Sequence, residues 1–391
     1  MESFVVGGIS ELFLVAHDGE IRLLPDAAFI VEDGIFTWIG KESDLELPTN
    51  YDVGRRSVIP GFVDSHTHLI FAGDRVQEFE ARMSGQPYAA GGIMSSVNAT
   101  RSATDEELLS AYTKRVHELH RNGITTFETK SGYGLTLKDE LRSLKIARMH
   151  TDEVTCLAAH VVPLEYRDNR EEYVRLVIDE ILPAAREYAS WVDVFCDVGA
   201  FSIDETRIIL DAATQYGYKK RLHANQLSEG EGVKLAVELG CISVDHCSHL
   251  SESDIELLSG SMTVATLLPI AEFSTRQPYP NARNLIDRNV NVALSTDCNP
   301  GSSYSTSMSF AIALAVCEMG MTPREAIRAA TFMGAMALGR NDIGAIAVGR
   351  QADFIVLDAR SHAHIAYRPG VDLIAEVFKS GEQIVKKEHN G

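Results

Sequence analysis

Apolar, β-branched runs of strand length alternate with amphipathic segments of helix length through the middle of this 391-residue chain. The alternation is typical of parallel βα units, because parallel strands must be joined by crossover connections. Eight such runs follow one another, at 61–69, 123–134, 155–163, 192–202, 219–226, 241–250, 262–269 and 291–303. Eight strands with intervening helices predict an α/β fold, a (β/α)8 TIM-type barrel.

The two ends of the chain differ from the middle. The first sixty residues consist of short strand-like stretches between Gly, Asp and Pro turns, and "ADFIVLDA" and "IAEVFKSGEQIVKK" near the C-terminus have the same character. We therefore expect one small β-sandwich-like domain built from residues 1–59 and 346–391, with the barrel at 60–345. The rival architecture, a doubly wound open sheet, would gather its polar residues at one switch point.

Polar residues instead follow nearly every one of the eight runs, where a barrel of this kind carries its active site. His66 and His68 lie two apart on a strand, so both imidazoles point to the same face. His223 ends the fifth run and Asp297 ends the eighth. An isolated His-x-His pair is usually structural, but these four residues converge if the barrel forms. Three imidazoles and a carboxylate suit Zn or Fe(II), with a position left for water.

We expect a single divalent ion. A binuclear site would ordinarily need a bridging carboxylated lysine at the end of the fourth strand, and that strand contains no lysine. Lys130 ends the second strand instead, where we expect it to pair with Glu128 or to support the loop.

The chemistry that follows is hydrolysis, because a bound metal ion lowers the pKa of water and polarises a carbonyl group. His246 ends the sixth run and is the candidate general base or electrophile, with Asp297 as its partner in proton transfer. His249 competes for that role but lies three residues into the loop. His160 also points into the predicted barrel mouth.

The composition of the chain argues against some classes of binding partner. The formal net charge of -19 argues against nucleic acid and anionic membrane surfaces, which need a positive face. The six cysteines show no paired spacing, the N-terminus lacks a basic region before its apolar residues, and no apolar run is long enough to span a bilayer. We expect a soluble cytoplasmic protein, and a monomer and a homodimer fit the sequence equally.

The stretches "PGFVDSHTH", "LHANQ", "SVDHCSHL", "STDCNPGSS" and the late "GAIAVGRQADFIVLD" together resemble the amidohydrolase superfamily over almost the whole chain. The resemblance implies the metal ligands already chosen, namely His66, His68, His223 and Asp297. With "HLIFAGDR" and "KSGYGL" added, the chain is similar to members that hydrolyse 4-imidazolone-5-propanoate to N-formimidoyl-L-glutamate in histidine degradation. For these members the resemblance implies substrate contacts at Arg75, Tyr133, His160, Gln226, Asn299, Gly301 and Ser302.

One position departs from the resemblance. Some members carry Glu where this chain has Gln226, and a glutamine cannot act as a general base, so proton transfer falls on His246 and Asp297. The first alternative is another mononuclear amidohydrolase, such as a purine or pyrimidine aminohydrolase, although such enzymes characteristically have a carboxylate at this position. The second is a non-catalytic barrel, which we would expect to have lost metal ligands.

Overall fold

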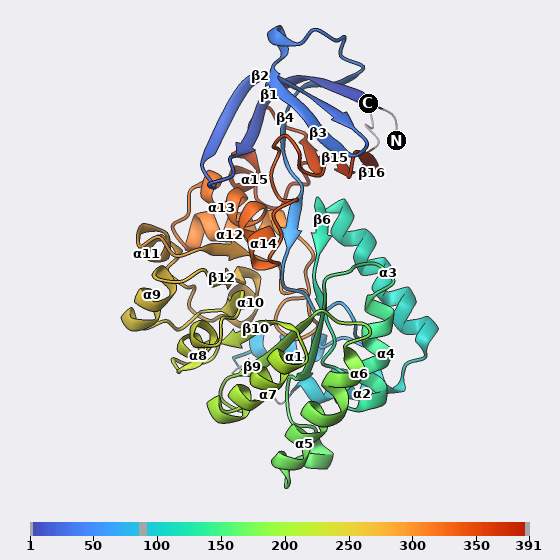
Figure 1. The fold of residues 1–391 in the computed structure, drawn as a ribbon, viewed down its shortest axis with the longest axis vertical. Coiled ribbons are helices and arrows are strands. Elements are labelled where there is room, and N and C mark those ends of the chain that lie inside the picture. The colour runs from blue at the N-terminus through green and yellow to red at the C-terminus, as the bar shows by residue number, and fades with distance from the viewer. Residues whose placement is uncertain (1–2, 86–91, 388–391) are drawn as a thin grey trace. The chain divides into compact units, whose positions relative to one another are not determined.

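A computed structural model describes residues 3–85 and 92–387 (Figure 1). The chain divides into two compact units. One comprises residues 1–64, 117–126 and 307–391, and the other comprises residues 65–116 and 127–306. The domain boundaries expected from the sequence, at residues 59/60 and 345/346, stay a prediction.

The first unit contains a seven-stranded sheet in the order β16-β15-β14-β4-β1-β2-β3. Its strands are β1 (Phe4–Val15), β2 (Ile21–Glu32), β3 (Ile35–Lys41), β4 (Tyr51–Pro60), β14 (Phe354–Leu357), β15 (Ile374–Lys379) and β16 (Glu382–Lys386). β14 pairs antiparallel with β4 and so joins the two ends of the chain. A buried cluster that includes Phe29, Phe36 and Phe354 packs on this sheet. The strands hydrogen-bond in one continuous sheet, and the sandwich-like arrangement stays a prediction.

The second unit contains a parallel sheet in the order β13-β12-β11-β10-β9-β8-β7. Its strands are β7 (Thr129–Lys130), β8 (Val154–Ala159), β9 (Trp191–Cys196), β10 (Lys219–Ala224), β11 (Ser243–His246), β12 (Val264–Leu267) and β13 (Val292–Leu294). Strands β8 and β9 are buried at every residue, as expected for a parallel sheet covered on both faces. This burial explains why the sequence shows continuous apolar runs rather than alternation.

Residues 65–68 close the ring. They continue from β5 (Phe62–Asp64), which pairs with β6 (Ile124–Phe127) in a separate two-stranded sheet. The carbonyl of Thr67 accepts a hydrogen bond from the Lys130 amide (3.1 Å), and that of His66 accepts one from the Asp297 amide (3.1 Å). This segment therefore lies between the two edges of the seven-stranded sheet. The predicted α/β barrel is confirmed, with the second run divided into two short strands at Glu128.

Helices follow most barrel strands, and side chains cap the first turns of several of them. Thr104 and Glu107 hydrogen-bond reciprocally at the start of α3, and Ser202 and Glu205 do so at the start of α7. The helices are α1 (Val76–Met83), α2 (Ile93–Ser102), α3 (Asp105–Arg121), α4 (Leu137–Ala147), α5 (Arg170–Leu176), α6 (Leu182–Ala185), α7 (Ile203–Gln215), α8 (Gly232–Glu238), α9 (Glu252–Ser259), α10 (Pro269–Thr275), α11 (Ala282–Asp287), α12 (Met308–Glu318), α13 (Pro323–Ala329), α14 (Phe332–Ala337) and α15 (His364–Tyr367).

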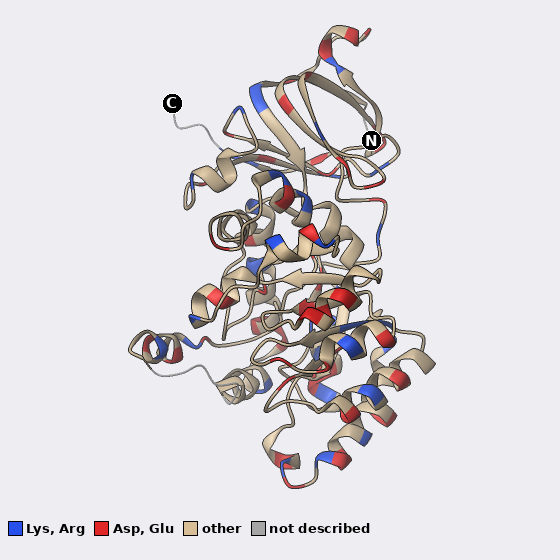
Figure 2. Cartoon of the chain, turned by 90° about the vertical axis from the view of Figure 1, so that its left-hand side faces the viewer, with Lys and Arg blue, Asp and Glu red and all other residues tan. Residues whose placement is uncertain are grey.

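Acidic and basic residues are interspersed along these helices (Figure 2). The helices within residues 3–85 and 92–387 are all too short or too polar to cross a membrane.

Candidate active site

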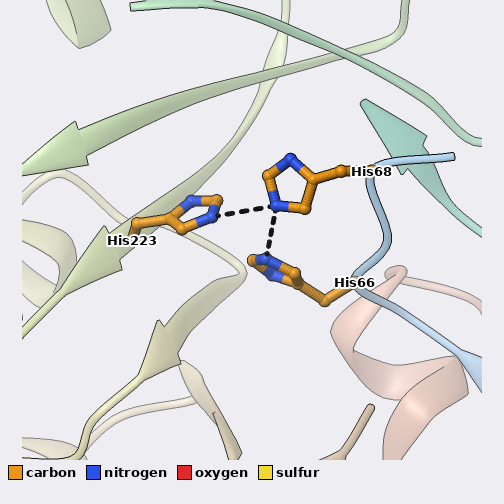
Figure 3. A group of neighbouring side chains, drawn as sticks. All are labelled: His66, His68 and His223. Carbon is orange, nitrogen blue, oxygen red and sulfur yellow. Dashed lines mark hydrogen bonds between the residues drawn. The ribbon is translucent and has the colours of Figure 1, made fainter. Parts of the chain in front are cut away.

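Three imidazoles converge at the C-terminal ends of the barrel strands (Figure 3). The Nε2 atom of His68 lies 3.3 Å from Nε2 of His66 and 3.4 Å from Nε2 of His223. All three side chains are buried. The period of two along an extended chain explains why His66 and His68 share a face, and the parallel register brings the end of β10 to the same place.

The carboxylate of Asp297 completes this group. Its Oδ1 lies 3.6 Å from Nε2 of His66 and 3.5 Å from Nε2 of His68. Asp297 has a left-handed backbone conformation (φ 54°). This conformation is unfavourable for a residue that has a side chain, so the surrounding structure must stabilise it. The Ser302 hydroxyl donates a hydrogen bond to Oδ2 (3.2 Å) and helps to hold it.

Two further carboxylates orient the imidazoles from behind. Nδ1 of His66 is 2.7 Å from Oδ2 of Asp245, so Nδ1 carries the proton and Nε2 presents its lone pair to the centre. Nδ1 of His223 lies 2.9 Å from Oδ2 of Asp193, although the two atoms are not aligned as in a hydrogen bond. Burial alone would raise the pKa of Asp193, but His223 and Lys130 outweigh it and lower the pKa.

Lys130 balances the charge of these carboxylates. Its ammonium group is fully buried, 3.0 Å from Oε1 of Glu128 and 3.1 Å from Oδ2 of Asp193. The expected pairing of Lys130 with Glu128 is therefore present. Burial raises the pKa of Asp245, and nearby Arg221 and Lys130 oppose that rise.

This donor set fits a divalent cation. Three imidazole nitrogens that face one another at 3.3–3.4 Å cannot all be satisfied by shared protons, whereas a cation accepts all three lone pairs. Burial, with neighbouring cationic groups, lowers the pKa of His66 and His68 well below the ordinary value, which keeps both in the neutral form that binds metal. Burial also raises the pKa of Asp297 well above its ordinary value, so its ionised form requires a compensating positive charge.

His246 faces the same centre. Its ring centroid is 5.7 Å from that of His66 and 5.2 Å from that of His223, and ligand atoms of His66, His246 and Asp297 come within 4.8 Å of one another. Nδ1 of His246 is buried and has no hydrogen-bond partner among the described residues. Burial lowers the pKa of His246 well below its ordinary value, so the ring is neutral and can accept a proton.

The competing residue, His249, forms backbone hydrogen bonds with Asn225. Its amide donates to the Asn225 carbonyl (2.9 Å), and its carbonyl accepts from the Asn225 side chain (2.9 Å). The loop after β11 is thereby fixed to the end of β10. These contacts fix the backbone of His249, whose buried Nε2 has no hydrogen-bond partner among the described residues. The choice of His246 over His249 stays a prediction.

The cavity in front of the imidazoles contains most of the residues expected to contact substrate. Its lining is His68, Arg75, Ile93, Tyr133, His160, Val161, Phe195, His223, Gln226, His246, Asp297, Asn299 and Ser302. A larger cavity of about 610 Å³ involves residues 196–203 and 228–232 but none of the converging imidazoles. The smaller cavity is therefore the one that can carry the chemistry.

Arg75 lies against Gly301. A Cβ atom at position 301 would lie 2.2 Å from Nη1 and 2.9 Å from Cζ of Arg75, so any larger residue there would displace the buried guanidinium. The other edge of the guanidinium donates to Oε2 of Glu78, through Nε at 2.9 Å and through Nη2.

The Asn299 side chain is engaged within its own loop. Its amide nitrogen donates to the Asp297 carbonyl (2.7 Å) and to the Ser302 hydroxyl (2.9 Å), and its oxygen accepts from the amides of Gly301 and Ser302. These four bonds shape the loop that carries Asp297. Substrate contact by Asn299 stays a prediction.

Sequence reasoning missed Asp193, Asp245 and Arg221. All three are fully buried on barrel strands, and buried charged groups are rarely found without partners. An acidic residue inside an otherwise apolar strand, as in "VDVFCD" and "SVDH", was the available signal.

Comparison with known proteins agrees with this geometry. The Amidohydrolase family profile matches residues 57–384. Among solved structures, guanine deaminase from C. acetobutylicum superposes with a TM-score of 0.72 at 15% identity, covering 98% of this chain and 100% of that one. A triazine hydrolase variant gives a TM-score of 0.75 at 16% identity, covering 99% of this chain and 95% of that one. At such identities these structures support the fold alone.

The chain belongs to the amidohydrolase family, and the family together with the His/Asp cluster indicates a metal-dependent hydrolase. Two curated relatives then narrow the assignment. A protein of Streptomyces avermitilis is 56% identical over 365 residues, which cover 93% of this chain and 88% of the relative. A protein of Salinispora tropica is 54% identical over 387 residues, covering 97% and 98%. Both are named imidazolonepropionase, and within the amidohydrolases this chain belongs with the imidazolonepropionases.

Proposed function

We propose that this enzyme hydrolyses the ring C–N bond of 4-imidazolone-5-propanoate to give N-formimidoyl-L-glutamate, a step of histidine degradation. The observation that carries the proposal is the identity of more than half of the aligned residues to proteins named imidazolonepropionase over nearly the full chain. The cavity chemistry supports it, because an arginine and several neutral hydrogen-bonding groups face a centre that suits a metal ion.

We infer one divalent ion, Zn or Fe(II), held by His66, His68, His223 and Asp297. Such an ion supplies a lowered pKa for water and polarises a carbonyl oxygen. The contribution of the protein is to hold the imidazoles in the correct tautomer. Asp245 does so for His66 through a hydrogen bond of 2.7 Å. The charge of Asp193, 2.9 Å from Nδ1 of His223, favours a proton on that nitrogen.

His246 and Asp297 move the protons. His246 is neutral, and its buried ring faces the centre, so it can take the proton of the attacking water and stabilise the oxyanion that develops on the ring carbonyl. Asp297, supported by Ser302, receives this proton from His246 and delivers it to the departing ring nitrogen. Gln226, half-buried beside them, donates or accepts a hydrogen bond but transfers no proton.

The remaining cavity residues recognise the substrate. A guanidinium binds a carboxylate with two parallel hydrogen bonds, and we assign Arg75 to the propionate of the substrate. Tyr133 and His160 lie beside His68, with ring centroids at 6.3 Å and 5.4 Å from it, and we assign them to the imidazolone ring. Gly301 gives Arg75 its space.

We further infer a cytoplasmic location. All six cysteines are unpaired thiols, as is usual in a reducing compartment.

The test is to add freshly prepared 4-imidazolone-5-propanoate to protein stripped of metal and to protein reloaded with Zn or Fe(II). Formation of N-formimidoyl-L-glutamate is followed for wild type, His246→Ala and Arg75→Ala. We expect fast conversion only by the reloaded wild type, a loss in kcat for His246→Ala and a raised KM for Arg75→Ala. Decay of the substrate at its spontaneous rate with reloaded wild type would refute the assignment.

A further inference from the structure

A fully buried carboxylate holds the loop "KSGYGL" between β7 and α4. Oε1 of Glu140, in the first turn of α4, accepts hydrogen bonds from the backbone amides of Gly134 (2.9 Å) and Leu135 (2.7 Å). Its Oε2 accepts one from the amide of Gly132 (3.1 Å). Glu140 has no solvent exposure, so water cannot replace these bonds.

The three amides lie on either side of Tyr133. Gly132 and Gly134 have no side chains, and a Cβ atom at Gly134 would lie 2.5 Å from the backbone of Asp139. The loop can therefore pack directly against the start of α4. With an anchored amide before it and another after it, Tyr133 has little freedom to change its position in the cavity.

The same loop also holds His160. Nδ1 of His160 donates a hydrogen bond to the Gly132 carbonyl (3.0 Å), which leaves Nε2 unprotonated in the neutral ring. The ring stacks on His68, with centroids 5.4 Å apart and planes inclined by 26°. A Cβ atom at Gly132 would lie 2.9 Å from Nδ1 of His160. The position of His160 thus depends on the peptide that Glu140 anchors.

An acidic residue in the first turn of a helix is commonly explained by the helix dipole alone. The first turn of α4 is already capped by the Thr136 hydroxyl, which accepts a hydrogen bond from the amide of Asp139. The Glu140 carboxylate is directed back to the preceding loop and is buried. A group placed in this way restricts the loop more than it stabilises the helix.

We propose that Glu140 is a positioning residue for substrate recognition, which fixes Tyr133 and His160 through the backbone of residues 132–135. The inference rests on the proposed function, because it takes these two side chains to contact the imidazolone. Glu140 itself does not touch the substrate.

Glu140→Gln tests the proposal, because glutamine keeps the size of the side chain but turns one acceptor into a donor that faces a backbone N–H. The matched control is Glu153→Gln. Glu153 is also a buried glutamate, accepts a hydrogen bond from Nε1 of Trp191 (2.9 Å), and precedes β8 at the end of the strand remote from His160. Both variants lose one buried hydrogen-bond acceptor, so a general loss of stability affects both.

We expect Glu140→Gln to raise KM for 4-imidazolone-5-propanoate, and the dissociation constant of imidazole-4-propionate, by roughly tenfold or more. Metal content should equal that of wild type, and kcat should change by less than about threefold. Glu153→Gln should lower the melting temperature without changing KM. If Glu140→Gln does not fold, the same measurements are made on Glu140→Asp, whose shorter side chain cannot reach all three amides.

Wild-type KM in the folded Glu140 variant, with only a lower melting temperature, would overturn the proposal and leave Glu140 a structural residue. Failure of the wild type to convert the substrate would instead refute the proposed function. The two failures are therefore distinguishable.

Discussion

Replacing Gly301 by alanine should displace Arg75 and weaken binding of an anionic substrate. The new Cβ would lie 2.2 Å from Nη1 of Arg75, whereas carbon makes favourable contacts at about 3.5 Å or more. The guanidinium must therefore move by roughly 1 Å or more, which breaks the geometry of a two-point contact with a carboxylate. Losing a hydrogen bond to a charged group costs about 1.5–3 kcal/mol. At about 1.4 kcal/mol per tenfold, kcat/KM should fall by about 10- to 150-fold, mainly through KM.

The assay is steady-state conversion of 4-imidazolone-5-propanoate, repeated with 4-imidazolone, which lacks the propionate. Gly260→Ala is the control, since a Cβ there would meet nothing closer than 3.6 Å at the end of α9. Gly301→Ala should differ from wild type only with the propionate-bearing substrate. Folded Gly301→Ala protein with an unchanged KM, or with an equal loss for both substrates, would refute the assignment of Arg75 to the propionate.

Three further predictions concern proton transfer, the metal ion and pH. His246→Ala should lower kcat by about 10²- to 10⁴-fold with unchanged metal content, and loss of the metal from this variant would mean that His246 is a ligand. Chelation of the metal should abolish activity and lower the melting temperature, and Zn or Fe(II) should restore both; His223→Ala should not be restored. Burial raises the pKa of Glu272 from 4.5 to about 7, so the folded state binds a proton that the unfolded state releases, and stability falls as pH rises through this range. The wild-type protein loses up to about 3 kcal/mol of unfolding free energy in this way. The unfolding free energy of Glu272→Gln should depend less on pH between 5 and 8. Parallel pH profiles for the two proteins would contradict that account.

The barrel and its histidines could be predicted from the sequence because both depend on local patterns. A buried parallel strand is apolar throughout, so a histidine or aspartate at its end is conspicuous, as with His223 and Asp297. The pattern also places His66 and His68 on one face without any knowledge of their neighbours.

The supporting groups could not be predicted in this way, because their partners are distant in the sequence. Lys130 pairs with Asp193, and Asp245 pairs with His66, across elements that only the closed barrel brings together. Glu140 looks like an ordinary first-turn acid of an amphipathic helix, and its burial against the preceding loop is visible only in three dimensions. The left-handed backbone at His246 and Asp297 is likewise set by tertiary contacts, since His and Asp tolerate that conformation better than most residues but still adopt it only rarely.

The most direct test of the proposed reaction is conversion of 4-imidazolone-5-propanoate in water enriched in ¹⁸O, with the product examined by mass spectrometry. Hydrolysis at the ring carbonyl predicts N-formimidoyl-L-glutamate with the label in the carboxylate formed from that carbonyl, released at a rate that depends on bound metal. Label in an N-formyl group, the product of attack at the ring carbon between the two nitrogens, or product that forms equally fast without the metal-loaded enzyme, would contradict the account.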